Sequence, residues 1–356
     1  LPDSSSTPAR VFLLISLLWD FIDKVRSLFC VSFAAIWCQY MPKFLCVRLI
    51  ALSFGRRECD LSILMSRCQR LLLLKHSTLA PQAPFNGKGR PIWAFRRSGV
   101  WRLVAGYFPA SFITETKLDA GRSYIFALHP HGICGIGAWV NIMTDGTAGF
   151  LAQHPWLDVS CVTVRANFLI PLWRDLVVLG FGLVDASKDS CRAVLSHGRS
   201  LAIVVGGAAE SLDAHPGTLD LTLRKRRGFV AMALETGADL VPVLTFGETN
   251  LFAQAPNPRG SRLRRFQEGT IRRFGFAAPL FYGRGIIQPW FGLVAHREPL
   301  VTVFGAPLRV EKAIATPTAE QIDALHERYV AALMLLFERH RHALAPDCAK
   351  GLRIVA

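Results

Sequence analysis

The sequence predicts an α/β fold, a mostly parallel sheet flanked by helices, preceded by an N-terminal helical segment that associates with a membrane. Short apolar runs alternate with helical patterns from residue 89 onwards, as in chains that build parallel sheets. Residues 1–88 differ in kind, because they are hydrophobic and basic. The whole chain is 51% hydrophobic and only 19% charged, against about 25% charged in soluble domains, which favours membrane association.

The N-terminal region contains three hydrophobic stretches, none of them a clean membrane span. Residues 11–19 are too short to cross a bilayer, whereas residues 27–42 lack formal charge and could form a short span or a re-entrant hairpin. Residues 63–76 are Leu-rich and basic, as in an interfacial helix. A Pro/Gly-rich linker follows at 80–91. We therefore predict a membrane-associating region over 1–88 and an α/β domain over 89–356.

Strands and helices alternate along the α/β domain. Residues 226–236 predict a helix that stops at Gly237, and Thr318 with Gln321 predicts a capping box at the start of a long helix. The apolar stripe of that long helix is interpreted as core packing; it comprises Ile322, Leu325, Tyr329, Leu333 and Leu336. Five strands are expected, over residues 124–129, 158–164, 201–205, 240–246 and 300–304.

The net charge of the chain indicates which classes of partner it could bind. A net charge of +15 suits nucleic acid, an anionic membrane surface or a polyanionic small molecule such as a nucleotide. The sequence has no helix-turn-helix, zinc-finger spacing or RNP-like motif, so nucleic acid is disfavoured. Nine cysteines without a CxxC motif indicate free thiols in a cytosol-facing protein rather than a disulfide scaffold.

Two histidines, His129 and His131, follow the strand at 124–129, where sites of parallel sheets commonly lie. They could cap a turn, or bind a metal with Cys134 and a further histidine drawn from His154, His197 and His215. In a third interpretation, one imidazole acts as a general base that takes the proton of an alcohol attacking an activated carbonyl. The N–H groups that follow His131 would then stabilise the developing oxyanion.

Five further blocks identify a family. Together with the histidine block they resemble the type-2 diacylglycerol acyltransferases, a family that also contains monoacylglycerol acyltransferases and some wax synthases. The resemblance covers about residues 91–345 and rests on an ordered set of motifs: GYFPASF (106–112), HPHG (129–132), VRANFLIP (164–171), VVGGAAESLDAHPG (204–217), TLRKRRGFVAMALETGADLVPVLTFGETNLF (222–252) and FYGRG (281–285).

The resemblance implies a glycerolipid acyltransferase-like fold and an acyl-CoA:diacylglycerol O-acyltransferase of the endoplasmic reticulum membrane and lipid droplets, which makes triacylglycerol. Its implied partners are acyl-CoA, diacylglycerol or a related acceptor, and the membrane, and a homo-oligomer is left open. No metal and no cofactor besides acyl-CoA, the acyl-donor substrate, is expected. The same chemistry on monoacylglycerol or a long-chain alcohol, and a catalytically silent lipid-droplet scaffold, are the alternatives.

The resemblance also assigns the catalytic histidines. The family's proposed catalytic histidine matches His131, and His129 is the other histidine of its motif. The wider glycerolipid acyltransferases carry an Asp five positions after their histidine, but Cys134 and Ile136 occupy those positions here. We therefore predict that Glu210 orients His131, with a helix N-cap contact as its alternative role.

The remaining site residues are expected to bind substrate. Backbone N–H groups of Gly132, Ile133 and Cys134 are predicted to stabilise the oxyanion, and Asn167 to donate a hydrogen bond near the thioester. Glu248 is a second candidate carboxylate. A basic run is predicted to bind the CoA phosphates, with a solvated or lipid-facing patch as the alternative; it comprises Arg224, Lys225, Arg226 and Arg227.

Overall fold

The structure is a computed structural model that describes residues 87, 89, 91–144, 150–168, 180–285, 291–346, 348 and 350–355. The expected membrane-associating region, residues 1–88, lies outside the described residues apart from Gly87. That region and its boundary at residue 88 therefore stay predictions. No helix within the described ranges is both long and apolar enough to cross a bilayer.

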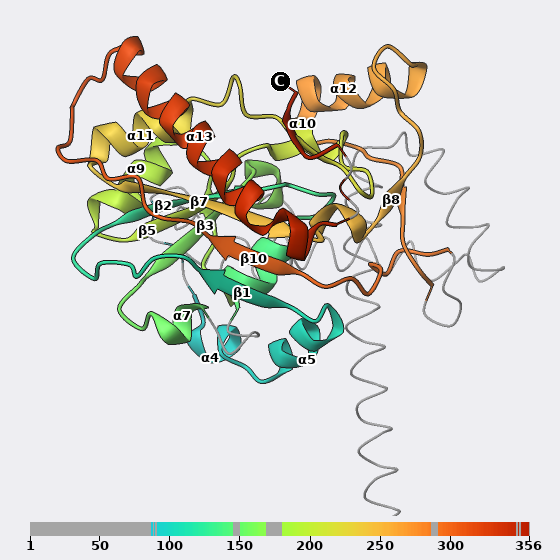
Figure 1. The fold of residues 1–356 in the computed structure, drawn as a ribbon, viewed down its shortest axis with the longest axis horizontal. Coiled ribbons are helices and arrows are strands. Elements are labelled where there is room, and N and C mark those ends of the chain that lie inside the picture. The colour runs from blue at the N-terminus through green and yellow to red at the C-terminus, as the bar shows by residue number, and fades with distance from the viewer. Residues whose placement is uncertain are drawn as a thin grey trace, which may run out of the picture. The chain divides into compact units, whose positions relative to one another are not determined.

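A seven-stranded sheet lies at the centre of the described chain, in the order β1–β10–β7–β2–β5–β3–β4 (Figure 1). Five neighbouring strands, β7 to β4, are parallel, whereas β10 runs antiparallel to β7 and parallel to β1. The mostly parallel sheet expected from the sequence is thus confirmed. Its strands are β1 (Ser111–Thr114), β2 (Tyr124–His129), β3 (Val159–Thr163), β4 (Val184–Asp185), β5 (Ser200–Val204), β7 (Asp239–Phe246) and β10 (Val301–Phe304).

The five strands expected from the sequence all form, and their ends differ from the expected ranges by at most one residue. The strands that the sequence did not reveal are short or lie at an edge of a sheet, so they lack a long apolar run. They are β1 and β4 of the main sheet, and two small two-stranded sheets: β6 (Leu219–Leu221) with β11 (Leu352–Ile354), and β8 (Ala253–Gln254) with β9 (Phe281–Tyr282).

Helices cover both faces of the sheet (Figure 1). One face carries α9 (Lys188–Ser196), α11 (Gly228–Thr236) and α13 (Ala319–Leu344), and the other carries α5 (Val100–Tyr107), η2 (Trp139–Met143) and α7 (Phe150–Gln153). The other helical elements of the described chain are α4 (Trp93–Arg96), α6 (Ile136–Ala138), η3 (Arg165–Phe168), α10 (Gly207–Ser211), η5 (Glu248–Asn250) and α12 (Arg262–Phe274).

Strand β2 runs through the middle of the core, and all six of its residues are buried. Its side chains alternate between the two hydrophobic cores: Ile125 and Ala127 join the core under α11 and α13, whereas Phe126 and Leu128 join the opposite one. His129, the last residue of the strand, continues the first set. The alternation therefore directs its ring towards α13.

The helix signals in the sequence are confirmed. Helix α11 ends at Gly237, whose φ of 74° is left-handed, and Thr318 and Gln321 form both hydrogen bonds of a capping box at the start of α13. The predicted stripe of α13 packs into the core, with Ile322 partly buried and four residues fully so: Leu325, Tyr329, Leu333 and Leu336.

Candidate active site

The loop after β2 lies between the ends of its two neighbours. Strand β2 pairs in parallel with β5 on one side and with β7 on the other, so the carboxyl ends of all three strands meet at one edge of the sheet. His129 ends β2 and His131 follows it. Glu210 lies in α10, shortly after β5, and Glu248 lies two residues after β7. The topology thus brings together three predicted catalytic residues and the second candidate carboxylate.

Glu210 is buried, with 1% of its surface exposed, and it binds two backbone segments. Its Oε1 accepts the His131 N–H at 2.6 Å, and its Oε2 accepts the Thr222 N–H at 2.7 Å. The contact to His131 is therefore through the backbone; no bond to the imidazole occurs among the described residues. Glu210 thus connects the loop that follows β2 to the chain that leads into the basic run at 224–227.

Glu248 binds the far end of the same loop. Its two carboxylate oxygens accept the N–H groups of Ile136 and Gly137, at 2.9 and 2.6 Å, and only 3% of its surface is exposed. These two donors are the first residues of α6. Two carboxylates from opposite sides of β2 therefore hold the loop from His131 to Gly137, which we call the histidine loop.

Burial controls the charge of both carboxylates. Desolvation raises the pKa of Glu210 to about 7, against the opposing effect of its two N–H donors and of the nearby Arg226 cation. Desolvation likewise raises the pKa of Glu248 to about 7, against its own two N–H donors. Near neutral pH each carboxyl group is therefore divided between its protonated and ionised forms.

The His131 ring is held in one tautomer. Its Nδ1 lies 3.0 Å from the carbonyl oxygen of Gly132, and because a carbonyl only accepts, Nδ1 carries the hydrogen. Burial lowers the pKa of His131 below its usual 6.5, partly opposed by that hydrogen bond, so the ring is neutral at pH 7. Nε2 is then the nitrogen with the free lone pair. The arrangement can accept a proton at Nε2.

His129 has a different environment. Its Nε2 lies 3.0 Å from the Tyr329 hydroxyl, which itself donates to the Ala127 carbonyl at 3.1 Å. Because the hydroxyl hydrogen is used, Nε2 of His129 is the donor to Tyr329, and its buried Nδ1 has no partner in the described part of the chain. Burial lowers the pKa of His129 to about 3, so the ring stays neutral.

Tyr329 was interpreted from the sequence as a core residue only. It is a core residue, but its hydroxyl also fixes His129. A tyrosine within an otherwise aliphatic stripe was the available signal, because a buried hydroxyl needs a partner. The metal interpretation of the histidines finds no ligand set: the residues that the structure describes contain no group of three or more His, Cys, Asp or Glu side chains that could hold an ion.

Comparison with known proteins decides the family. The sequence model of the family described as diacylglycerol acyltransferase matches residues 62–353 of this chain. The chain belongs to the diacylglycerol acyltransferase family. The resemblance expected from the ordered motifs is confirmed.

Individual members of the diacylglycerol acyltransferase family are similar to this chain over most of their length. Diacylglycerol O-acyltransferase 2A of Umbelopsis ramanniana is 43% identical over 278 residues, which cover 77% of this chain and 78% of that protein. Diacylglycerol O-acyltransferase 2 of Dictyostelium discoideum is 44% identical over 268 residues, 75% and 80% of the two chains. The 2-acylglycerol O-acyltransferase 1 of Bos taurus is 44% identical over 263 residues, 73% and 77% of the two chains.

Three backbone amides of this diacylglycerol acyltransferase family member directly follow His131. The N–H groups of Gly132, Ile133 and Cys134 donate to no acceptor in the described part of the chain, whereas the next helical amides are taken by Glu248. The predicted oxyanion donors are therefore not used by other described groups. Their role stays a prediction.

Another predicted substrate-binding residue, Asn167, lies outside this loop. Asn167 donates from Nδ2 to the Thr163 hydroxyl at 2.6 Å, and no described contact joins it to His131.

All four residues of the basic run are exposed. Arg226 donates to the Gly206 carbonyl at 3.0 Å, next to α10, whereas Arg227 pairs with Asp323 of α13 and binds the Arg224 carbonyl. Arg226 thus connects the basic run to the element that carries Glu210.

Two glycines of the histidine loop give a matched test of its packing. Both have a left-handed backbone, with φ of 56° at Gly132 and 66° at Gly135, but a Cβ on Gly132 would lie 2.7 Å from Glu248 Cγ, whereas a Cβ on Gly135 meets nothing closer than 3.8 Å. We expect Gly135→Ala to cost about 1–2 kcal/mol from backbone strain alone. Gly132→Ala is expected to cost more, because it also displaces Glu248.

The comparison is read from thermal unfolding and from the acyl transfer rate of both variants. Gly132→Ala should lower both quantities more than Gly135→Ala does. Equal effects of the two substitutions would contradict the close packing of Glu248 against the loop.

Proposed function

We propose that this chain transfers the acyl group of acyl-CoA to the free hydroxyl of diacylglycerol and so makes triacylglycerol at a membrane. The observation that carries the proposal is the state of His131. Its Nδ1 is committed to the Gly132 carbonyl, its ring is neutral, and its Nε2 lone pair lies on a loop held at the edge of a parallel sheet. Membership of the diacylglycerol acyltransferase family supports acyl transfer to a glycerolipid.

The proposed reaction is a direct displacement. Nε2 of His131 takes the proton of the acceptor hydroxyl as its oxygen attacks the thioester carbonyl. The tetrahedral oxyanion is stabilised by the N–H groups of Gly132, Ile133 and Cys134. Collapse of this intermediate breaks the carbon–sulfur bond, and the CoA thiolate takes the proton from the His131 imidazolium. A positioned base contributes about 10²–10⁴ in rate, and one oxyanion donor about 10²–10³.

The donor substrate is proposed to bind through the basic run. The CoA phosphates would contact Arg226 and its exposed neighbours, and the first N–H groups of α11, which begins at Gly228, would add to this site. Asn167 is proposed to lie near the thioester, and His129 to support the loop through Tyr329. The proposal uses no metal and no cofactor besides acyl-CoA, and it locates the enzyme in the endoplasmic reticulum membrane and on lipid droplets.

A second candidate function changes only the acceptor. The Bos taurus relative is named a 2-acylglycerol O-acyltransferase and is as similar to this chain as the diacylglycerol enzymes are. Its name supports monoacylglycerol as the alternative acceptor. The same chemistry would then produce diacylglycerol.

The test is an acyl transfer assay on membranes that contain this chain. Labelled acyl-CoA is offered with diacylglycerol, monoacylglycerol or a long-chain alcohol, and the labelled esters are separated. We expect triacylglycerol from diacylglycerol as the main product, above membranes that contain the His131→Ala variant. Preferential labelling of diacylglycerol from monoacylglycerol would favour the second candidate, and the absence of any labelled ester would favour a silent scaffold.

A further inference from the structure

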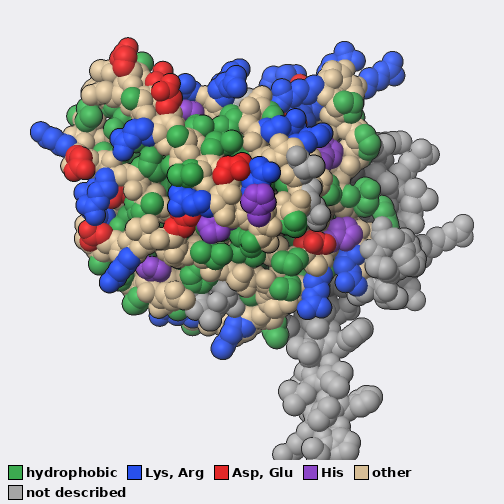
Figure 2. All heavy atoms as spheres, viewed as in Figure 1, with side chains coloured by type: hydrophobic (Ala, Val, Ile, Leu, Met, Phe, Trp, Pro, Cys, Tyr) green, Lys and Arg blue, Asp and Glu red, His purple; other side chains and the backbone are tan. Residues whose placement is uncertain are grey.

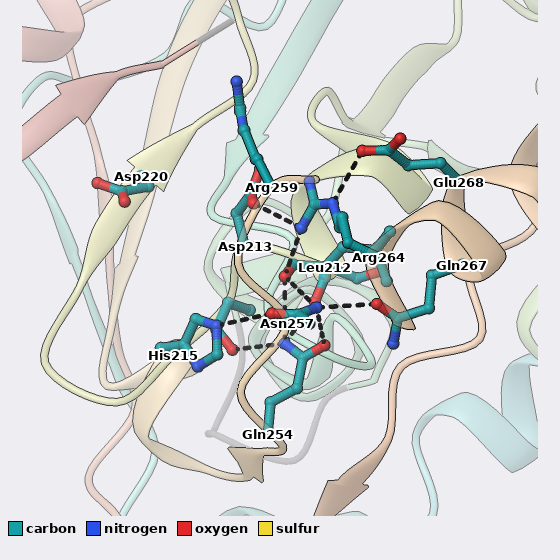
Figure 3. Close-up of polar contacts among 12 residues, drawn as sticks. Leu212, Asp213, His215, Asp220, Gln254, Asn257, Arg259, Arg264, Gln267 and Glu268 are labelled. Carbon is teal, nitrogen blue, oxygen red and sulfur yellow. Dashed lines mark hydrogen bonds and ion pairs between the residues drawn. The ribbon is translucent and has the colours of Figure 1, made fainter. Parts of the chain in front are cut away.

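Polar contacts hold helix α12 to the rest of the described chain. Its inward residues Arg264 and Gln267 are buried, with 5% and 0% of their surfaces exposed. Arg264 donates to the Leu212 carbonyl at 2.9 Å and pairs with Asp213 at 2.8 Å, while the Gln267 side chain accepts from Asn257 at 3.0 Å (Figure 3). Because several charge-assisted or buried hydrogen bonds hold one side of α12, its opposite side has a fixed orientation.

That outer side carries arginines around one aromatic ring. Four arginines are exposed on it, and Phe266, between them along the helix, has 64% of its surface exposed. The spacing of three and four residues places all five on one side of a helix. Figure 2 shows Lys and Arg side chains gathered over the part of the molecule that carries α12 in Figure 1. We call these residues the α12 stripe: Arg262, Arg265, Phe266, Arg272 and Arg273.

Three arginines of the α12 stripe, Arg262, Arg265 and Arg272, have no acidic partner among the described residues. Arg264 on the inner side, by contrast, has two, Asp213 and Glu268. Three exposed cations therefore face outwards without a counter-charge from the described residues. The stripe is complementary to a surface of negative charge.

We propose that the α12 stripe docks on an anionic phospholipid surface. From residue 262 to residue 273 the helix extends roughly 16 Å, so the arginines would meet several headgroups rather than one. A helix that presents basic residues with an aromatic ring among them suits the interface, where the cations bind headgroups and the ring enters the acyl boundary. A soluble polyanion would satisfy the charges but would leave Phe266 in water.

Docking on a phospholipid surface rests on the proposed function, because the proposed acceptor, diacylglycerol, lies in a bilayer. The inner contacts of α12 reach Leu212 and Asp213, which follow α10 and its Glu210. Docking through the α12 stripe would therefore place the catalytic edge of the sheet near the lipid that supplies the acceptor.

The first test measures how strongly anionic lipid enhances binding of the full chain to vesicles. Partition coefficients are measured at limiting lipid for vesicles of phosphatidylcholine alone and of phosphatidylcholine with phosphatidylserine, so that their ratio removes charge-independent anchoring. We expect the variant R262Q/R265Q/R272Q to lower that ratio by roughly 100-fold, about fivefold for each arginine. The effect should shrink as salt is raised.

The matched control removes the same charge elsewhere. The variant R309Q/K312Q/R328Q changes three exposed residues, of which Arg309 and Lys312 precede α13 and Arg328 lies within it. Helix α13 begins on the side of the described domain away from α12 (Figure 1). Its ratio should stay close to that of the unchanged chain. An equal loss in both triple variants, or no loss in R262Q/R265Q/R272Q, would overturn the proposal.

A second test asks what touches Phe266. The photoreactive substitution Phe266→p-benzoylphenylalanine should form a phospholipid adduct in vesicles with phosphatidylserine, whereas the same substitution at Leu335, which is 55% exposed on α13, should not. An adduct to protein, or none, would overturn the proposal. Acyl transfer in detergent micelles is measured in parallel. Failure of the unchanged chain there would count against the proposed function, whereas the vesicle results alone decide the docking surface.

Discussion

The His131→Ala variant is expected to lose about 10²–10⁴-fold in kcat while its fold stays intact. The loss follows because Nε2 of His131 is the proposed proton acceptor, and alanine leaves the acceptor hydroxyl without a base. The fold should survive because the ring is partly exposed and its hydrogen bond is to the carbonyl of the next residue, Gly132. The measurements are initial rates of labelled ester formation on membranes and the thermal unfolding midpoint of the purified chain.

A control histidine has similar bonding but lies at the other edge of the sheet. His197 follows α9 and precedes β5, and its ring binds the Ala193 carbonyl as the ring of His131 binds that of Gly132. His197→Ala should keep kcat within a factor of about two, since a surface substitution changes little. A His131→Ala enzyme as active as the His197→Ala control would remove the base from the mechanism.

The pKa of His131 also predicts how the acyl transfer activity depends on pH. The base acts when neutral, so activity rises with pH through the pKa of His131. Because burial lowers that pKa below its usual 6.5, the acid limb of kcat/KM should have its midpoint below pH 6.5. A midpoint above 6.5 would mean that a charge partner stabilises the imidazolium.

The positions of the histidines could be predicted from the sequence, but the contacts around them could not. Strand 124–129 was visible as an apolar run, because a central parallel strand is buried on both faces. Its end therefore located His129 and His131 at a sheet edge. The strand order β7–β2–β5 arises from tertiary pairing, and no sequence pattern predicts it. Without it, Glu210 and Glu248 cannot be seen to approach the same loop from opposite sides.

The role of Glu210 shows why a residue motif underdetermines a contact. Its carboxylate was expected to orient the imidazole, because the family's wider relatives use an acid for that purpose. In the structure the carboxylate accepts the backbone N–H of His131 instead. Every residue except proline offers a backbone N–H, so no sequence pattern identifies which one is bound. By contrast, the capping box at Thr318 and Gln321 is local and was predicted correctly.

The Glu210→Ala variant is expected to lose stability as well as activity. Removal of the carboxylate leaves the N–H groups of His131 and Thr222 without acceptors, at about 1–3 kcal/mol each when buried, or about 2–6 kcal/mol together. Activity should fall because the histidine loop and the chain before the basic run lose their shared anchor. Glu210→Gln keeps one acceptor oxygen, and we expect an intermediate loss of both quantities.

The pH profile of Glu210→Gln separates backbone anchoring from a charge partnership with His131. If Glu210 acts through the backbone, the variant lowers kcat and the unfolding midpoint, and the acid limb of kcat/KM stays in place. If its negative charge stabilised the imidazolium, removing that charge would move the limb to lower pH. The control Glu235→Gln changes a half-buried carboxylate of α11 that pairs with Arg192 of α9. It should leave the acid limb in place and change the free energy of unfolding by no more than about 0.5 kcal/mol. A displaced limb with unchanged stability would contradict the anchoring role and return Glu210 to the imidazole.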